Sequence, residues 1–105
     1  MWYIKINEKS NDLVKSNGFD KRLITLLNPS SFEAEQIRIL QANILHAHTK
    51  KIPRTILVTS AIPGEGKSFI AANLAICLAK TMDQYSLLID CDLRIPSIHR
   101  LFGYS

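Results

Sequence analysis

The sequence predicts an α/β fold in which a parallel β-sheet is flanked by helices. An apolar, β-branched run spans residues 55–60, a glycine-containing turn and a largely apolar stretch follow at 61–82, and a second short apolar run spans 86–89. Strands that are buried on both faces of a sheet have this composition. A strand, a helix and a strand over this length form a βαβ unit, which places the two strands parallel to each other.

The first 28 residues show no sustained hydrophobic period and contain the turn signals Asn11-Asp12 and Asn17-Gly18. We expect residues 1–28 to form a loosely ordered arm with one short strand near Tyr3–Ile6. Residues 29–105 then form the folded unit. We expect this unit to be truncated after its second core strand.

Two long helices are predicted. The first runs from Ser31 to about His48, because Ser30-Ser31-Phe32-Glu33 fits a capping box and an apolar stripe recurs at three- and four-residue steps. That stripe consists of Ile37, Leu40, Ile44 and Ala47, with Glu35 and Arg38 on the opposite side and Gln41 on the flank. The second helix, Ser68–Met82, is apolar nearly all round, so other elements must cover it. Pro96 interrupts the chain after the second strand, and Ile98–Phe102 begin another helix.

Composition restricts the class of protein. With 105 residues, 47% of them hydrophobic and 21% charged, the chain has the make-up of one ordinary globular domain. Its net charge of +4 favours anionic partners such as phosphates, nucleic acid or an acidic membrane surface. Cys77 and Cys91 lack the spacing of a metal site, so we expect both to be reduced core residues. Because no segment approaches the ~18 apolar residues of a membrane span and no signal peptide is evident, we expect a cytoplasmic protein, or one held at a membrane by a partner.

The turn between the first predicted strand and the second long helix carries the main chemical signal. Residues 61–68 match G-x-x-x-x-G-K-[ST], except that alanine replaces the first glycine. Glycines at 64 and 66 allow backbone N–H groups to form an anion-binding nest, which the following helix N-terminus strengthens. Lys67 then contacts the β- and γ-phosphates of a nucleotide, and Ser68 ligates Mg²⁺. The alternative is a glycine-rich turn with a surface lysine. The predicted nucleotide-binding residues are Ala61, Ile62, Pro63, Gly64, Glu65, Gly66, Lys67, Ser68 and Phe69.

Two carboxylates, Asp90 and Asp92, end the second predicted strand. In an open parallel sheet the carboxyl ends of the strands line the ligand crevice, so both side chains should face the phosphates. Two acids beside a triphosphate require a magnesium ion. One of them can hold the metal while the other accepts a proton from an attacking hydroxyl. Alternatively, Asp92 caps the next turn or pairs with Arg94.

These motifs together resemble the bacterial tyrosine autokinases, the cytoplasmic kinases or kinase domains of capsule and exopolysaccharide export. The resemblance covers about Leu23 to Gly103. It rests on the loop sequence and on four further features, which are the runs Phe32–Arg38, Ala72–Ala75 and Leu88–Pro96 and the pair His99 and Phe102.

The resemblance implies an ATP-dependent protein-tyrosine kinase that regulates polysaccharide polymerisation and export. Lys67 and Ser68 would hold ATP and Mg²⁺, Asp92 would serve the metal, and Asp90 would be the base for the tyrosine hydroxyl. It also implies a membrane-embedded polysaccharide co-polymerase or activator as the partner, and a place at the inner face of the membrane. Nucleic acid is not an expected partner.

The resemblance further implies ring assembly through an E-x-x-R-x-x-R helix. Glu35 and Arg38 match this pattern, whereas Gln41 stands where the family has arginine. A homo-oligomer is therefore expected through Glu35 and Arg38. The alternative is a helix with a polar outer face.

Two features of that family are not found in the sequence, namely a later strand ending in a Walker B aspartate and a tyrosine-rich tail. For this reason we expect the chain alone to be inactive as a kinase. Two other functions stay open. One is a non-kinase ATPase of the partitioning class. Those relatives usually have a lysine at the position of Ile62, so this residue argues against that function. The other is a non-catalytic nucleotide-binding remnant.

Overall fold

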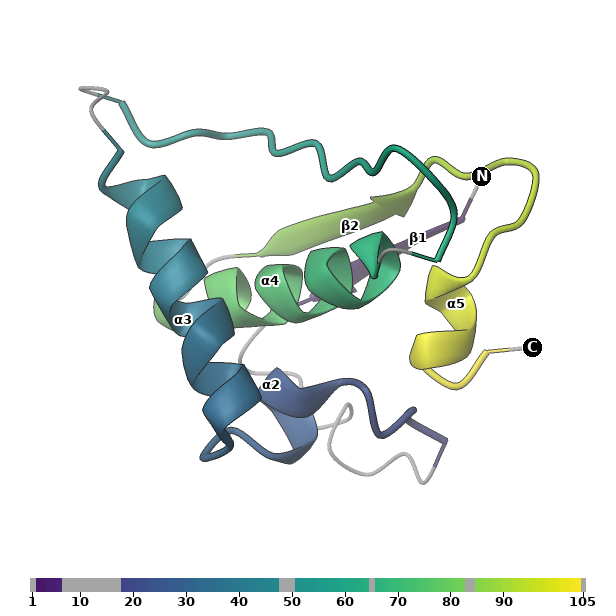
Figure 1. Ribbon diagram of the computed structural model, residues 1–105, viewed down its shortest axis with the longest axis horizontal. Helices are drawn as coiled ribbons and strands as arrows, with labels where there is room; N and C mark the ends of the chain where they lie inside the picture. Colours follow the sequence, from purple (N-terminus) through teal and green to yellow (C-terminus); the bar gives the residue numbers. More distant parts are fainter. Residues whose placement is uncertain (1, 7–17, 48–50, 65, 83–84, 105) are drawn as a thin grey trace.

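The computed structural model describes residues 2–6, 18–47, 51–64, 66–82 and 85–104. These residues form a small α/β domain (Figure 1). In chain order, its elements are strand β1 (Trp2–Ile6), helices α2 (Ile24–Leu27), α3 (Phe32–Leu45) and α4 (Lys67–Met82), strand β2 (Ser86–Asp90) and helix α5 (Ile98–Leu101).

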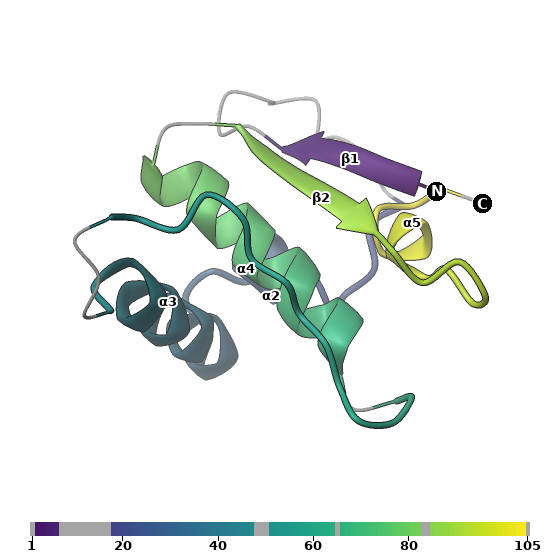
Figure 2. The ribbon, with the colours of Figure 1, turned by 90° about the horizontal axis from the view of Figure 1, so that it is seen from above.

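Helix α4 is the central element, as its apolar sequence predicts. It packs against α3 and α2 on one side and against β2 on the other, and α5 contacts both α4 and β1 (Figure 2). The buried core joins the inner face of α4 to the sheet and to the last helix. Its members are Ile6, Leu23, Ala72, Ala75, Ile76, Ala79, Leu88, Ile98, Leu101 and Phe102. No helix in the described part of the chain is long and apolar enough to cross a membrane.

The sheet differs from the predicted one. Its two strands are β1 and β2, which pair antiparallel with Trp2 opposite Asp90 and Ile6 opposite Ser86. The short strand expected near Tyr3–Ile6 is thus confirmed, but the predicted parallel sheet is not. Residues 55–60 follow an extended course in Figure 1 and, within the described part of the chain, belong to no strand. Strands must lie about 4.8 Å apart to share backbone hydrogen bonds, and a groove separates residues 51–58 from β2.

The segment before α3 is part of the core, although a loosely ordered arm was expected there. Leu23 is fully buried, and Thr25 in α2 is 4% exposed. The buried amide of Asn73 in α4 holds this segment in place. Its Oδ1 accepts from the backbone N–H and the hydroxyl of Thr25 at 3.1 and 2.9 Å. Its Nδ2 donates to the carbonyls of Arg22 and Phe69, both at 2.9 Å.

Helix α3 begins as the sequence predicts, one residue out of register with the expected capping box. Ser31 is the N-cap, and its Oγ accepts from the backbone N–H of Ala34 at 3.1 Å. Because Ala34 takes the third helical position, a single serine cap replaces the box predicted from Glu33. The helix ends at Leu45. Its predicted end at His48 lies outside the described residues.

Gly103 ends α5 in a left-handed conformation with φ of +81°. A Cβ at this position would lie 2.7 Å from the backbone oxygen of Gly18. Gly103→Ala therefore combines an unfavourable backbone angle with a clash against another backbone segment. We expect it to lower the free energy of unfolding by about 2 kcal/mol. Urea unfolding followed by circular dichroism measures this. A change within about 0.5 kcal/mol of zero would contradict the predicted close packing.

A candidate nucleotide-phosphate site

The predicted phosphate loop connects the extended residues 55–60 to the N-terminus of α4. Gly64 and Gly66 have φ of +82° and +85°, the left-handed region that only glycine enters at no cost. A Cβ at either position would meet no atom within 4 Å. The backbone angle, not the lack of space, therefore explains these glycines. The open space beside them leaves the loop accessible to a phosphate, and Glu65 lies outside the described residues.

Lys67 and Ser68 form the first turn of α4, where helix N–H groups and the helix dipole favour an anion. Both residues are half-buried. The Ser68 hydroxyl lies 3.0 Å from the hydroxyl of Ser97, in the segment that follows β2. This contact joins the first turn of α4 directly to the segment that follows Asp90 and contains Asp92.

Asp90 is buried at the end of β2, with 5% of its surface exposed. Its Oδ1 accepts from the backbone N–H of Asp92 at 3.0 Å. Its Oδ2 accepts from the backbone N–H groups of Ser97 and Ile98 at 3.0 and 3.1 Å. One carboxylate thus fixes both ends of the segment between β2 and α5. As a result, it sets the position of the Ser97 hydroxyl beside Ser68.

Asp92 lies on the more exposed side of the same segment. Its Oδ1 accepts from the backbone N–H groups of Ile95 and Arg94 at 3.0 and 3.3 Å. Its Oδ2 has no hydrogen-bond partner in the described part of the chain. The pKa of Asp92 lies below its ordinary value, first because of the Ile95 N–H group, then because of the Arg94 N–H group and the positive charges of Lys67 and Arg94. Asp92 is therefore ionised at neutral pH and lies within the electrostatic reach of Lys67.

The fold thus brings the hydroxyls of Ser68 and Ser97 together and places Asp92 where the charge of Lys67 acts on it. Asp90 serves as a hydrogen-bond acceptor for the backbone. Of the remaining predicted loop residues, Ala61 to Gly64 are exposed and Phe69 is half-buried. Sequence reasoning missed Ser97, whose neighbours Pro96 and Ile98 indicated only the start of a helix. No local sequence pattern identifies Ser97, because its position depends on a hydrogen bond from its backbone N–H to Asp90, seven residues earlier.

The hydroxyl of Ser68 lies beside that of Ser97, and oxygen atoms of this kind suit a magnesium ion. The two serine hydroxyls and the Asp92 carboxylate are hard oxygen ligands of the kind Mg²⁺ prefers. Among the described residues, no group of three or more histidine, cysteine, aspartate or glutamate side chains could hold a metal by itself. A metal at this site would therefore depend on phosphate oxygens and water for its other ligands.

The predicted assembly face on α3 is only partly exposed. Arg38 pairs with Glu35 of the same helix at 2.7 Å and donates to the carbonyl of Pro29 at 2.8 Å. Gln41, expected on the flank, is 4% exposed and packs against α4. Its Oε1 accepts from the Cys77 thiol at 2.9 Å, and its Nε2 has no partner in the described part of the chain. An arginine at position 41 would bury a charge here.

The two cysteines occupy different environments. Cys77 is buried, and burial raises the pKa of its thiol, as the sequence predicts for a core residue. Cys91 is exposed, contrary to that prediction. Both are free thiols.

Comparison with known proteins gives one family match. The family described as "ParA: NUBPL iron-transfer P-loop NTPase" matches residues 51–105, the half of the chain that contains the loop and both carboxylates. No solved structure matches the chain at a significant level.

Several curated relatives are named tyrosine-protein kinases. Tyrosine-protein kinase YwqD of Bacillus subtilis is 39% identical over 84% of this chain and 37% of its own length. Putative tyrosine-protein kinase AmsA of Erwinia amylovora is 39% identical over 78% of this chain and 11% of its own length. Tyrosine-protein kinase wzc of Salmonella typhimurium is 34% identical over 91% of this chain and 14% of its own length. The chain therefore spans little more than a third of the first of these proteins and much less of the other two.

Proposed function

Because this chain belongs to the ParA family of P-loop NTPases, we propose that it binds ATP through residues 61–69. We further propose that it is the nucleotide-binding part of a tyrosine-protein kinase. The observation that carries this proposal is the junction of the phosphate loop with the segment after β2, where the Ser68 and Ser97 hydroxyls lie 3.0 Å apart. The names of the relatives support the kinase assignment over other P-loop activities.

Each residue has a distinct role in this proposal. Lys67 and the loop N–H groups bind the phosphates, while Ser68 and Asp92 hold the magnesium ion, which would supply charge neutralisation at the phosphates. Asp90 holds the segment that bears Asp92 and Ser97. The function of Asp90 as the base for a tyrosine hydroxyl stays a prediction. Three backbone N–H groups already donate to this carboxylate, two of them to Oδ2, so the tyrosine hydroxyl would have to approach Oδ1.

The wider biological role follows from the same lineage. We propose that the protein acts in the polymerisation and export of exopolysaccharide or capsule, at the cytoplasmic face of the membrane, with a membrane-embedded co-polymerase as its activator. Self-association through the exposed Glu35 and Arg38 belongs to the same proposal. The burial of Gln41 limits that contact to two of the three positions in the E-x-x-R-x-x-R pattern.

Nucleotide binding is tested with Lys67→Met. Lys67 is a half-buried charge at the N-terminus of α4 and is absent from the hydrophobic core. The substitution should therefore remove a phosphate contact without unfolding the domain. We expect at least a tenfold loss of ATP affinity, corresponding to about 1.4 kcal/mol, by isothermal titration calorimetry with Mg²⁺. Lys21→Met, at an exposed site outside the loop, is the control and should bind as the unaltered chain does. Equal affinity in the Lys67 and Lys21 variants would remove the basis of the proposal.

A second activity is favoured by the family description, which names an iron-transfer P-loop NTPase. The fate of the labelled γ-phosphate of ATP distinguishes a tyrosine kinase from a non-kinase ATPase. Transfer to tyrosine in a longer chain that contains these residues indicates a kinase, whereas release of phosphate alone indicates a non-kinase ATPase. We expect the 105-residue chain to bind ATP without phosphorylating itself. Phosphotyrosine that forms on this chain and is lost in Lys67→Met would contradict that expectation.

A further inference from the structure

The Ser97 hydroxyl does not do what a serine at the start of a helix usually does. Ser97 is the N-cap residue of α5, and serine is favoured at this position because its oxygen accepts from a backbone N–H group in the first turn. The Ser97 side chain makes no such hydrogen bond. Its oxygen lies 3.0 Å from the hydroxyl of Ser68 instead. A residue type that normally caps a helix therefore contacts the proposed nucleotide site.

The buried Asp90 carboxylate takes over the capping of α5. Its Oδ2 accepts from the backbone N–H groups of Ser97 and Ile98 at 3.0 and 3.1 Å. These two hydrogen bonds fix the backbone from which the Ser97 side chain extends. Figure 1 shows α5 beside the N-terminal end of α4, and the two helices are in contact. Both Ser68 and Ser97 are half-buried, so the fold itself holds their hydroxyls together.

The hydrogen-bonding capacity of the two hydroxyls suggests a direction for this contact. A serine hydroxyl has one proton to donate and two lone pairs with which to accept. In the described part of the chain, each hydroxyl has the other as its sole hydrogen-bond partner, and either oxygen can be the donor. If the Ser68 oxygen binds a cation through a lone pair, its proton must point away from that cation. The Ser97 oxygen can then accept the proton, and a fixed acceptor of this kind orients a metal ligand.

We propose that Ser97 is a positioning residue for Ser68. Its oxygen accepts the Ser68 proton and thereby leaves the Ser68 lone pairs to the magnesium ion of the bound nucleotide. Ser97 itself contacts neither the metal nor the phosphates. This inference rests on the proposed binding of Mg²⁺-ATP and adds to it a residue from outside the loop. Asp90 affects the metal site only indirectly, because it holds the backbone of Ser97.

The first test measures the ATP affinity of the full chain by isothermal titration calorimetry. Ser97→Ala should weaken Mg²⁺-ATP binding about fivefold, the loss expected for one neutral hydrogen bond. Ser97→Thr keeps the hydroxyl and should bind within about twofold of the unaltered chain. With EDTA in place of Mg²⁺, all three proteins should bind ATP equally, because Ser97 acts only through a metal ligand.

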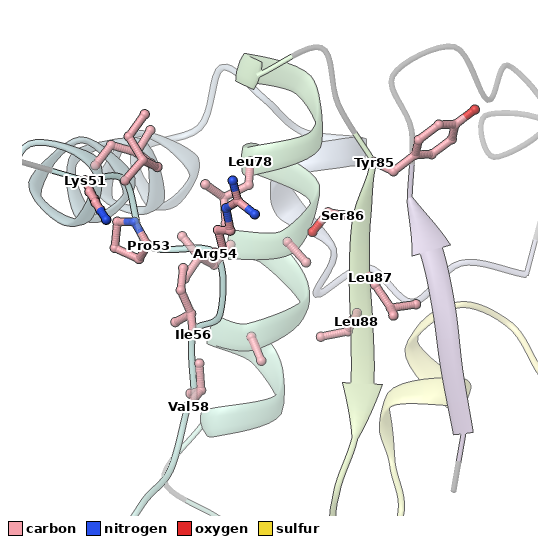
Figure 3. A pocket seen from close by; sticks show the side chains of 15 residues that line it. Lys51, Pro53, Arg54, Ile56, Val58, Leu78, Tyr85, Ser86, Leu87 and Leu88 are labelled. Carbon is pink, nitrogen blue, oxygen red and sulfur yellow. The ribbon is translucent and has the colours of Figure 1, made fainter.

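Ser86→Ala is the matched control. Ser86 is also a half-buried serine, but it lies at the start of β2, whereas Asp90 lies at its end. It lines the groove between β2 and residues 51–58, which contains neither Ser68 nor Ser97 (Figure 3). Its replacement by alanine should leave ATP affinity unchanged, both with Mg²⁺ and with EDTA.

A double variant distinguishes a positioning residue from a second metal ligand. If Ser97 acts through Ser68, the double alanine variant should weaken Mg²⁺-ATP binding no more than Ser68→Ala alone. Two independent ligands would give losses that multiply. The same variants test the contact without any ligand, by thermal unfolding followed by circular dichroism. Each single variant should lower Tm by about 3 °C, and the double variant by about the same amount. The effects of Ser68→Ala and Ser86→Ala should add.

The outcomes separate this inference from the nucleotide site itself. If Mg²⁺-ATP binding depends on Lys67 but is equal in Ser97→Ala and the unaltered chain, the positioning role is wrong and the proposed function stands. The positioning role is also wrong if the losses multiply in the Ser68 and Ser97 double variant, if the loss persists with EDTA, or if Ser97→Thr binds as weakly as Ser97→Ala. Additive changes in Tm for this pair would show that the hydroxyl contact is absent. If the unaltered chain does not bind Mg²⁺-ATP, the proposed function fails and this inference fails with it.

Discussion

Replacing Asn73 by leucine is expected to lower the free energy of unfolding by about 4 kcal/mol, although the two side chains have nearly the same shape. Asn73 is completely buried, and its amide satisfies the N–H and hydroxyl of Thr25 and the carbonyls of Arg22 and Phe69. Leucine would leave several of these polar groups buried without partners, each at a cost of about 1–3 kcal/mol. Such a loss is a large fraction of the 5–15 kcal/mol typical of a folded domain.

The measurement is urea unfolding at neutral pH, followed by circular dichroism. Asn43→Leu is the control, because Asn43 is exposed on α3 and leucine is a good helix former. It should change the unfolding free energy by no more than about 0.5 kcal/mol. If Asn73→Leu is as stable as the control, the polar link between α2 and α4 contributes nothing and our account of the N-terminal segment is wrong.

The second large expected effect is a difference in stability between alanine variants of the two aspartates, Asp90 and Asp92. Asp90→Ala would leave the backbone N–H groups of Asp92, Ser97 and Ile98 without their acceptor, next to the buried Ile98. We expect it to destabilise the domain by about 3 kcal/mol. Asp92→Ala removes an acceptor only from the exposed N–H groups of Arg94 and Ile95, which water can satisfy. Its cost should stay below about 1 kcal/mol.

For ATP affinity, measured by nucleotide titration, we expect the larger effect from Asp92→Ala. In the presence of Mg²⁺, Asp92→Ala should weaken ATP binding by about tenfold or more while remaining folded, because it removes the carboxylate that we propose as a metal ligand. With EDTA in place of Mg²⁺, ATP binding by the unaltered chain and by this variant should become equal. If Asp90→Ala proves as stable as the unaltered chain, its three hydrogen bonds are not what fixes the segment. If Asp92→Ala binds Mg²⁺-ATP normally, the assignment of the metal ligand fails.

Local signals in the sequence predicted the elements that depend on local chemistry. Helix α4 and the left-handed glycines of the loop follow from composition and spacing, because a helix and a tight turn form from neighbouring residues. The serine cap of α3 was predicted to within one residue for the same reason. The sequence predicts that Asp92 faces the loop, and the structure shows an electrostatic effect of Lys67 on Asp92. Whether Asp92 holds a metal there stays a prediction.

Other features depend on partners distant in sequence. The pairing of β1 with β2 could not be predicted, because the alternating exposure of Tyr3 to Ile6 does not identify which strand edge they join. Gln41 is a polar residue that the helical pattern placed on the flank of α3, and Asn73 lies in a helix predicted only to be apolar nearly all round. The core retains both because Thr25 and Cys77 supply hydrogen bonds from other helices. Asp90 and Asp92 look equivalent in sequence and differ only through the turn that folds back on Asp90.

The pairing of Trp2 with Asp90 joins two segments that are far apart in the sequence. During synthesis on the ribosome, β1 emerges well before β2, its partner in the sheet. The high contact order of this pair predicts slow closure of the sheet, with helices forming ahead of it. Until then Ile4 and Ile6, which pack in or against the core, remain exposed to solvent. Chaperone contact during translation is therefore expected to concentrate on β1.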